Sequence, residues 1–430
     1  MTGLTRLLAI GQLALVAATW KLWTPQDVFP QVPLIRAACD CPGWTDWFCL
    51  GFLVTSSVVM LIAGRRVCAS RLASIGMAVS LAGFFILDQH RLQPWAWQFF
   101  LLSVLLSLAD DAIARRGWMW LVISIYFWSA VSKLDHTFCH VQGPALLSGL
   151  KQAMGLRGIP NHWTEMIDIA GAFCFALGEL GVALLLASPR TRWLGLWIAT
   201  IMHVTLLVAL GPLGLNHSNG VLLWNVFFIG QDWLLFRTVR KRQVTDATLT
   251  GGTWWRRLWS RFEWPGTFRD RSALAVIMAA MVWPLLEPVG LCDHWLAWAV
   301  YSGRPGHVDI MTTESHLRRL PLGADRTLYL PLGEMLHPIE LAYLKVGDWS
   351  LKELGAPNYP QHRFQVGVAW FLFDRFQLRG AILLYEPRNR WTGELGRSKT
   401  AEFSASSVGE LEILEKTFFW NSRPRRLANQ

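Results

Sequence analysis

The sequence is poor in charge and lacks two common cysteine motifs. Only 16% of its 430 residues are Asp, Glu, Lys or Arg, whereas about a quarter is usual in soluble proteins. Hydrophobic residues make up 53% of the chain, which is more apolar surface than a soluble chain readily buries. The seven cysteines include no CxxC pair, so a zinc ribbon and a thioredoxin-type motif are both excluded. The composition therefore indicates an integral membrane protein.

Apolar segments recur along the chain, each near the length of about 20 residues that a helix needs to cross a bilayer. They lie at 5–23, 46–64, 72–88, 95–110, 117–133, 166–187, 192–210, 219–236 and 272–290. The first could also be a signal peptide, but Trp20, Lys21 and Trp23 stand where small cleavage-site residues would be expected. We predict a polytopic α-helical membrane protein with about nine transmembrane helices.

Basic residues predict the orientation of these helices. They occupy every second loop: Arg65, Arg66 and Arg71, then Arg115 and Arg116, then Arg190 and Arg192, then Arg237, Arg240, Lys241 and Arg242. The intervening loops 24–45 and 211–218 contain a single Lys or Arg residue, Arg36. Because a Lys/Arg excess marks cytoplasmic loops, we expect a cytoplasmic N-terminus and an outer location for everything after the ninth segment. The net charge of +10 is then a property of membrane topology, with the lipid bilayer as partner and no nucleic acid.

The composition divides the chain into four regions. We predict an eight-span transmembrane domain at 1–236, a basic Trp-rich cytoplasmic linker at 237–271, a ninth transmembrane helix at 272–290 and an extracytoplasmic domain at 291–430. The linker could lie on an anionic leaflet as an amphipathic stretch, or could simply fix the topology.

The last region mixes charges of both signs with Pro and Gly turns. Arg326–Leu332, Phe364–Phe373 and Gly380–Tyr385 resemble short strands, and Val408–Thr417 resembles a helix. We therefore expect a C-terminal α+β or β-rich extramembrane domain.

Several ionisable residues lie inside or beside the predicted spans, where they are costly and usually either paired or functional. Lys133 ends the fifth span, whereas Glu179 and His203 lie within the sixth and seventh. Lys133 has no counter-ion nearby in the sequence, because Asp135 lies on a different helical face. The alternatives are structural: Lys133 as an interface anchor, Glu179 as one half of an ion pair, and His203 bonded to a neighbouring helix.

A polar run links the third and fourth spans, and outer-side cysteines form a second group. Asp88, Arg91, Gln93 and Trp95 belong to the run, in which Asp88 and Arg91 could pair and cap two helix ends. The cysteines expected outside are Cys39, Cys41, Cys139 and Cys292. Since an outer compartment permits oxidation, we predict one disulfide that involves Cys39 or Cys41, with Cys139 or Cys292 as its partner. We expect no metal site.

Two short motifs resemble the superfamily of vitamin K-dependent gamma-carboxylases and their bacterial relatives, the HTTM proteins. The run Ala130-Val131-Ser132-Lys133-Leu134-Asp135 is similar to the family's Gly-Val-Lys-Lys-Leu-Asp, and Met202-His203 is similar to a Phe-His stretch. The order of spans, the cytoplasmic N-terminus and an outer β-containing domain also agree. The resemblance implies a bacterial inner-membrane protein in which Lys133 is the base that takes a proton from reduced vitamin K or another quinol.

One position departs from the family pattern. The carboxylases carry Asn-Asn-His, with a histidine that assists catalysis, where this chain has Gln93-Pro94-Trp95. Trp95 therefore stands at the histidine position, and the resemblance does not extend to glutamate carboxylation. Asp88, Arg91, Gln93 and Trp95 are the expected cofactor-side residues.

Three functions remain open at this point. The first is a carboxylase-like membrane enzyme with Lys133, Glu179 and His203 at its centre and a quinone-like lipid as ligand. The second is a redox-associated membrane protein of the DoxX or MauE type, for which Cys39-Asp40-Cys41 is the only feature. The third is a non-catalytic module whose outer domain binds an unknown protein partner. A quinone-sized cavity beside Lys133 would favour the first.

Overall fold

The structure is a computed structural model of the chain. It describes residues 1–64, 66–156, 161–237, 266–302, 307–313, 329–330, 341–378, 380–385 and 403–426. Most of the predicted linker and most of the predicted strand Arg326–Leu332 lie outside these described residues.

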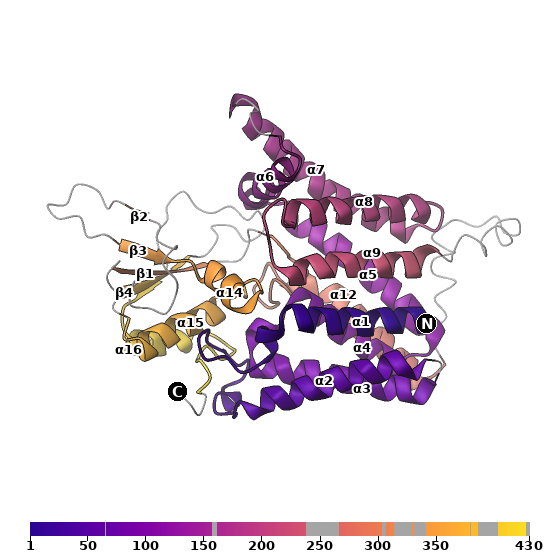
Figure 1. Cartoon of the computed structure of the whole chain (residues 1–430), viewed down its shortest axis with the longest axis horizontal. Coiled ribbons are helices and arrows are strands. Elements are labelled where there is room, and N and C mark those ends of the chain that lie inside the picture. Colours follow the sequence, from indigo (N-terminus) through magenta and orange to yellow (C-terminus); the bar gives the residue numbers. More distant parts are fainter. Residues whose placement is uncertain are drawn as a thin grey trace, which may run out of the picture.

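The chain is mostly helical. The long helices are α1 (Thr2–Ala18), α2 (Trp44–Ala63), α3 (Val67–Leu87), α4 (Pro94–Leu108), α5 (Asp111–Lys133), α6 (Gly143–Ala153), α7 (Asn161–Ala187), α8 (Arg192–Leu210), α9 (Asn219–Phe236) and α12 (Phe268–Val282). Each predicted apolar segment falls on one of these helices, and α6 is an addition that the sequence did not predict. Helices α1, α2, α3, α8 and α9 run side by side in Figure 1.

The ninth segment is shorter than predicted. Its helix ends at Val282 and continues only as a 3-10 turn, Trp283–Leu286. Pro284 lies in this turn, and a proline removes a backbone donor and hinders continuation of a helix. Residues 287–290 are therefore not helical.

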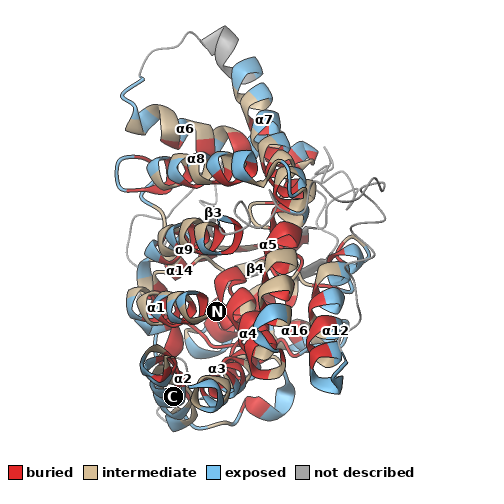
Figure 2. Ribbon diagram, turned by 90° about the vertical axis from the view of Figure 1, so that its right-hand side faces the viewer, coloured by how far each residue is buried: buried red, intermediate tan, exposed pale blue. Residues whose placement is uncertain are grey.

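Four of the described helices are long and apolar enough to cross a membrane: Trp44–Ala63, Val67–Leu87, Met166–Ala187 and Arg192–Leu210. Large apolar side chains remain exposed on them, among them Ile62 at 78% and Leu72 at 68%. Figure 2 shows exposed residues on the outward faces of the bundle and buried residues where helices meet. Extensive exposed apolar surface is rare on soluble monomers, so the arrangement supports a membrane protein.

A small sheet with helices follows the bundle. Its strands are β1 (His307–Thr313), β2 (Tyr329–Leu330), β3 (Leu341–Leu344), β4 (Gly380–Tyr385) and β5 (Phe403–Ala405), in the order β2-β3-β1-β4-β5 with antiparallel pairing throughout. The helices are α14 (Val346–Leu354), α15 (His362–Arg375) and α16 (Val408–Glu415). The predicted strand Gly380–Tyr385 and the predicted helix near Val408 are both present. We call the described residues from 291 to 426 the C-terminal unit.

The strand predicted at Phe364–Phe373 is wrong, because these residues form most of α15. Helix α15 is covered on several sides. Phe364 packs against Phe29 with ring centroids 6.5 Å apart, Gly367 lies against Val32, and Gln365 accepts a hydrogen bond from Val308 N of β1. A helix buried all round has no polar face, so its sequence lacks the helical period and resembles a buried strand.

The C-terminal unit joins the bundle through buried polar contacts. Arg425 donates to Asp46 of α2 at 2.6 Å, and Asn421 accepts from the Gln89 amide at 2.7 Å through its backbone carbonyl. Figure 1 shows the sheet elements beyond one end of the bundle, away from the N-terminus. The bundle end that meets this unit therefore contains the loops in which the polar run was found.

Candidate functional site

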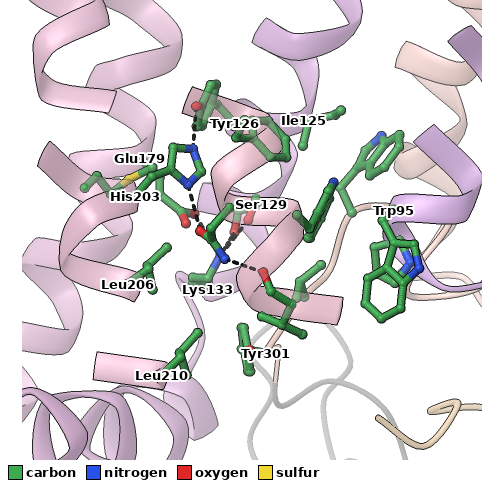
Figure 3. A pocket seen from close by; sticks show the side chains of 18 of the residues that line it. Trp95, Ile125, Tyr126, Ser129, Lys133, Glu179, His203, Leu206, Leu210 and Tyr301 are labelled. Atoms are coloured by element: carbon green, nitrogen blue, oxygen red, sulfur yellow. Dashed lines mark hydrogen bonds and ion pairs between the residues drawn. The ribbon is translucent and has the colours of Figure 1, made fainter. Parts of the chain in front are cut away.

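A cavity of about 180 Å³ lies where α5, α7, α8 and α9 approach the C-terminal unit (Figure 3). A cavity of about 150 Å³ in another protein binds benzene, so this one is large enough for an aromatic ring. Aromatic side chains supply much of its wall: Trp95, Phe175, Trp224, Phe228, Trp295 and Trp298. An apolar wall with a few convergent polar groups is the usual form of a small-ligand site.

Lys133 and Glu179 form an ion pair in the wall of this cavity. The lysine Nζ lies 2.8 Å from Glu179 Oε2, and the two side chains are only 3% and 7% exposed. Lys133 also donates to Ser129 Oγ at 2.5 Å. Ser129 precedes Lys133 by one helical turn on α5, so the two side chains share a face. The interpretation of Lys133 as an interface anchor is wrong, because its side chain points into the bundle and its counter-ion comes from α7.

His203 lies beside this pair and is bonded on both ring nitrogens. Its Nε2 is 2.7 Å from the Tyr126 hydroxyl, and its Nδ1 is 2.8 Å from Asn225 Oδ1. The same tyrosine hydroxyl lies 2.6 Å from Asp232 Oδ2. All three candidate catalytic residues, Lys133, Glu179 and His203, therefore line one cavity.

The polar run before α4 divides between two places. Gln93 and Trp95 line the cavity. Arg91 instead pairs with Asp46 and donates to Leu22 O at 2.8 Å, so it binds the bundle rather than the cavity.

Asp88 also lies outside the cavity wall. Its Oδ1 accepts from the backbone nitrogens of Val32 and His90 at 3.2 and 3.1 Å. The direct side-chain pairing that was one alternative for Asp88 and Arg91 is thus replaced by separate partners, and Asp88 and Arg91 are not among the cavity residues.

The C-terminal unit closes the cavity with residues that the sequence did not nominate. Trp298 and Tyr301 have backbone φ angles of 61° and 63°, a left-handed conformation that non-glycine residues rarely adopt and that often marks functional sites. Within the described part of the chain, the Nε1 atoms of Trp95 and Trp298 and the Tyr301 hydroxyl have no hydrogen-bond partner. Burial raises the pKa of Tyr301, so its hydroxyl stays protonated. Three buried donors without a partner in the described chain thus belong to residues of the cavity wall.

Tyr126, Asn225 and Asp232 were also missed. Tyr126 and Asp232 lie within the predicted spans 117–133 and 219–236, where the rule that ionisable residues in spans are paired or functional would have found the aspartate. No comparable signal marks Trp298 or Tyr301.

The cysteines nominated for a disulfide are free thiols in this structure: Cys39, Cys41, Cys139 and Cys292. None of them lines the cavity. Burial raises the pKa of both Cys39 and Cys292, which makes these thiols poor nucleophiles. Among the described residues there is also no cluster of three or more His, Cys, Asp or Glu side chains that could hold a metal ion.

No family model, no curated protein and no solved structure matches this chain.

Proposed function

We propose that the chain crosses the membrane about nine times, with its N-terminus in the cytoplasm and an α+β C-terminal unit outside a bacterial inner membrane. Basic residues gather at the bundle end away from the sheet, and support this orientation. There Arg71 pairs with Asp110 at 2.6 Å, Arg115 donates to Leu234 O at 3.0 Å, and Arg269 donates to Ser107 O at 2.9 Å.

Reporter fusions test the orientation. A reporter joined after residue 70 should be active only in the cytoplasm, and one joined after residue 302 only outside. A cytoplasmic signal from the second fusion would overturn the scheme.

We propose that this membrane protein is a carboxylase-like enzyme that binds an acidic aromatic lipid, such as a quinol, and removes its proton. The observation that carries the proposal is the buried Lys133–Glu179 pair in the wall of a ring-sized apolar cavity. Titratable groups that converge on such a cavity are the usual mark of a catalytic site.

The pair offers a way for a lysine to act as a base. An ammonium group has no lone pair, so Lys133 must lose a proton before it can accept one. Glu179 can take that proton directly, because Nζ and Oε2 are 2.8 Å apart. The transfer turns two charges into two neutral groups, which suits an apolar wall. The neutral amine can then accept the ligand's proton.

The redox alternative has less support. It depends on Cys39 and Cys41, which do not line the cavity and are not bonded to each other. The third alternative, a non-catalytic module with a protein partner, differs from the enzyme proposal in one measurable respect, because it does not require a ligand to ionise in the cavity.

Naphthol is a suitable probe, because its neutral and ionised forms have different ultraviolet absorption spectra. We expect wild-type protein in detergent micelles to bind naphthol and to hold part of it as naphtholate at neutral pH. Lys133→Arg keeps a cation opposite Glu179, but arginine stays protonated in proteins and so cannot accept the proton of naphthol. We expect the pKa of bound naphthol to rise by at least about one unit, so its ionised fraction should fall at least about tenfold.

Lys151→Arg is the matched control, since Lys151 of α6 pairs with Asp168 of α7, the helix that also carries Glu179, but away from the cavity. Naphthol that binds only in its neutral form, or an unchanged ionised fraction in Lys133→Arg, would refute the catalytic role. Mass spectrometry of lipids that copurify with the wild-type protein would identify the natural ligand.

A further inference from the structure

A chain of short hydrogen bonds leads away from the cavity into the bundle. It joins His203 of α8, Tyr126 of α5 and Asp232 of α9, at 2.7 and 2.6 Å. His203 and Tyr126 line the cavity, whereas Asp232 does not. Asp232 lies seven residues beyond Asn225 on α9, or about 10 Å along the helix axis, so the chain has a cavity end and a deep end.

The hydrogen positions in this chain follow from counting donors. The Asn225 Nδ2 atom donates to Val221 O at 2.9 Å, which directs Asn225 Oδ1 towards His203. An amide oxygen only accepts, so His203 Nδ1 must carry a proton. Tyr126 then has two short contacts, one to His203 Nε2 and one to Asp232 Oδ2, and its hydroxyl can supply a proton to only one of them.

One further proton completes the chain, and it has two possible positions. It can lie on Asp232, which then donates to Tyr126 while Tyr126 donates to His203. Alternatively it lies on His203 Nε2, which donates to Tyr126 while Tyr126 donates to an ionised Asp232. The total charge of the three groups is zero in both arrangements.

The burial of these groups favours the first arrangement. Asp232 is 1% exposed and His203 5% exposed, and separated charges in such surroundings are costly. Asp232 Oδ1 has no hydrogen-bond partner among the described residues. A carboxylate with one oxygen unpaired is especially costly to bury, whereas a protonated carboxyl group leaves only a neutral carbonyl oxygen unpaired.

We propose that His203, Tyr126 and Asp232 form a charge relay that places a cation beside the cavity when its ligand becomes an anion. The Asp232 O–H bond breaks and its proton passes to Tyr126 Oη, while the Tyr126 O–H bond breaks and its proton passes to His203 Nε2. No proton is exchanged with solvent, and one positive charge moves to the cavity wall. The inference rests on the proposed function, because it requires a ligand that ionises there.

The relay complements the Lys133–Glu179 pair. That pair can receive the ligand's proton, but its net positive charge then lies at only one point of the cavity wall. His203 adds a second positive charge in the cavity wall, and attraction between such charges and an anion is strong where water is excluded. The ligand class that this arrangement fits is a hydroxyaromatic acid whose anion spreads its charge over a ring.

Infrared difference spectroscopy tests the relay, because a protonated carboxylic acid has a C=O band that a carboxylate lacks. We expect ligand-free wild-type protein to show one such band that is absent from Asp232→Asn. The asparagine can still donate to Tyr126, so the fold should be retained. Asp168→Asn, at a partly exposed pair, is the matched control and should leave the band in place.

Naphthol and its methyl ether distinguish binding of the ring from ionisation of the ligand. Both have the same ring, but only naphthol ionises. In the wild type, naphthol should remove the Asp232 band and the ether should not. In Tyr126→Phe, which keeps the ring but breaks the chain, naphthol should leave the band unchanged.

An identical ligand-free spectrum for wild type and Asp232→Asn would overturn the relay, as would loss of the band on naphthol binding in Tyr126→Phe. Calorimetry on the same samples measures naphthol binding itself. Failure to bind would count against the proposed function, while the ligand-free comparison would still decide whether Asp232 holds the shared proton.

Discussion

Two residues between α3 and α4 should have opposite and nearly equal effects on the pH dependence of stability. Asp88 follows the last residue of α3, and His90 lies two residues further on in a buried turn. Burial raises the pKa of Asp88 to about 6 and lowers the pKa of His90 to about 4. Nearby Arg91 and Asp46 act on Asp88 as well, the cation lowering its pKa and the carboxylate raising it.

The signs follow from which state binds more protons. Between pH 4 and 6.5 the unfolded chain protonates His90 and the folded chain does not, so the contribution of His90 to stability increases with pH. Between pH 3.8 and 6 the folded chain protonates Asp88 and the unfolded chain does not, so the contribution of Asp88 decreases with pH.

The magnitudes nearly cancel in the wild type. The pKa of His90 changes from 6.5 to about 4 and that of Asp88 from 3.8 to about 6. At about 1.4 kcal/mol per pKa unit, each change amounts to about 3 kcal/mol. The two groups together should therefore leave stability almost independent of pH from 4 to 6, although each alone has a large effect.

Single substitutions should reveal the separate effects. His90→Gln can still donate to Pro357 O, which His90 Nε2 contacts at 2.8 Å. Asp88→Asn can still accept from the Val32 and His90 backbone nitrogens. We expect the unfolding free energy of His90→Gln, relative to wild type, to fall by about 3 kcal/mol as pH rises from 4 to 6.5. That of Asp88→Asn should rise by a similar amount from pH 4 to 6.

Urea unfolding in mixed micelles at several pH values is the assay, and the variant-minus-wild-type difference removes the titration of all other groups. Two flat differences would refute the reasoning. Slopes of the same sign for both variants would show that burial does not shift the two groups in opposite directions.

Two further changes test buried charges elsewhere in the fold. Glu179→Gln leaves the Lys133 ammonium without its counter-ion, so we expect a loss of about 3–5 kcal/mol in unfolding free energy. The double variant Lys133→Met with Glu179→Leu removes both charges and should lose far less. Equal losses for the two variants in urea unfolding would contradict this. Asp46→Asn removes the carboxylate that pairs with Arg425, so we expect a loss of unfolding free energy of similar size and faster proteolysis of the C-terminal tail. Asp110→Asn, at a more exposed pair, should lower the unfolding free energy by less than about 1 kcal/mol.

The helices of the bundle could be predicted because their signal is contained within each segment. The predicted bounds 192–210 and 219–236 coincide with α8 and α9, since Arg192 borders one apolar run and Gly211 and Arg237 end the two runs. The segment 272–290 was predicted too long, because a hydrophobicity window does not register the backbone donor that Pro284 lacks. Length and composition predict a helix, but local backbone chemistry sets its end.

The site was predicted only in part. The cost of burying charge pointed to Lys133, Glu179 and His203 as residues that need partners. It did not say which partner each would have, since Lys133 and Glu179 are 46 residues apart and meet only because α5 packs against α7. Trp298 and Tyr301 had no signal at all, because their role depends on a left-handed backbone conformation.

The pairing of Asp88 with Arg91, which the sequence left open, shows why proximity in sequence misleads for buried charges. A fully buried guanidinium needs several acceptors at fixed positions, and a carboxylate three residues away cannot supply them. Arg91 obtains them from Asp46 and from the carbonyls of Leu22 and Thr24. Asp46 in turn accepts from Arg425, near the other end of the chain. Buried charges thus find their partners in distant parts of the chain. The same need for a partner joins the cavity end of the bundle to the C-terminal unit that closes the cavity.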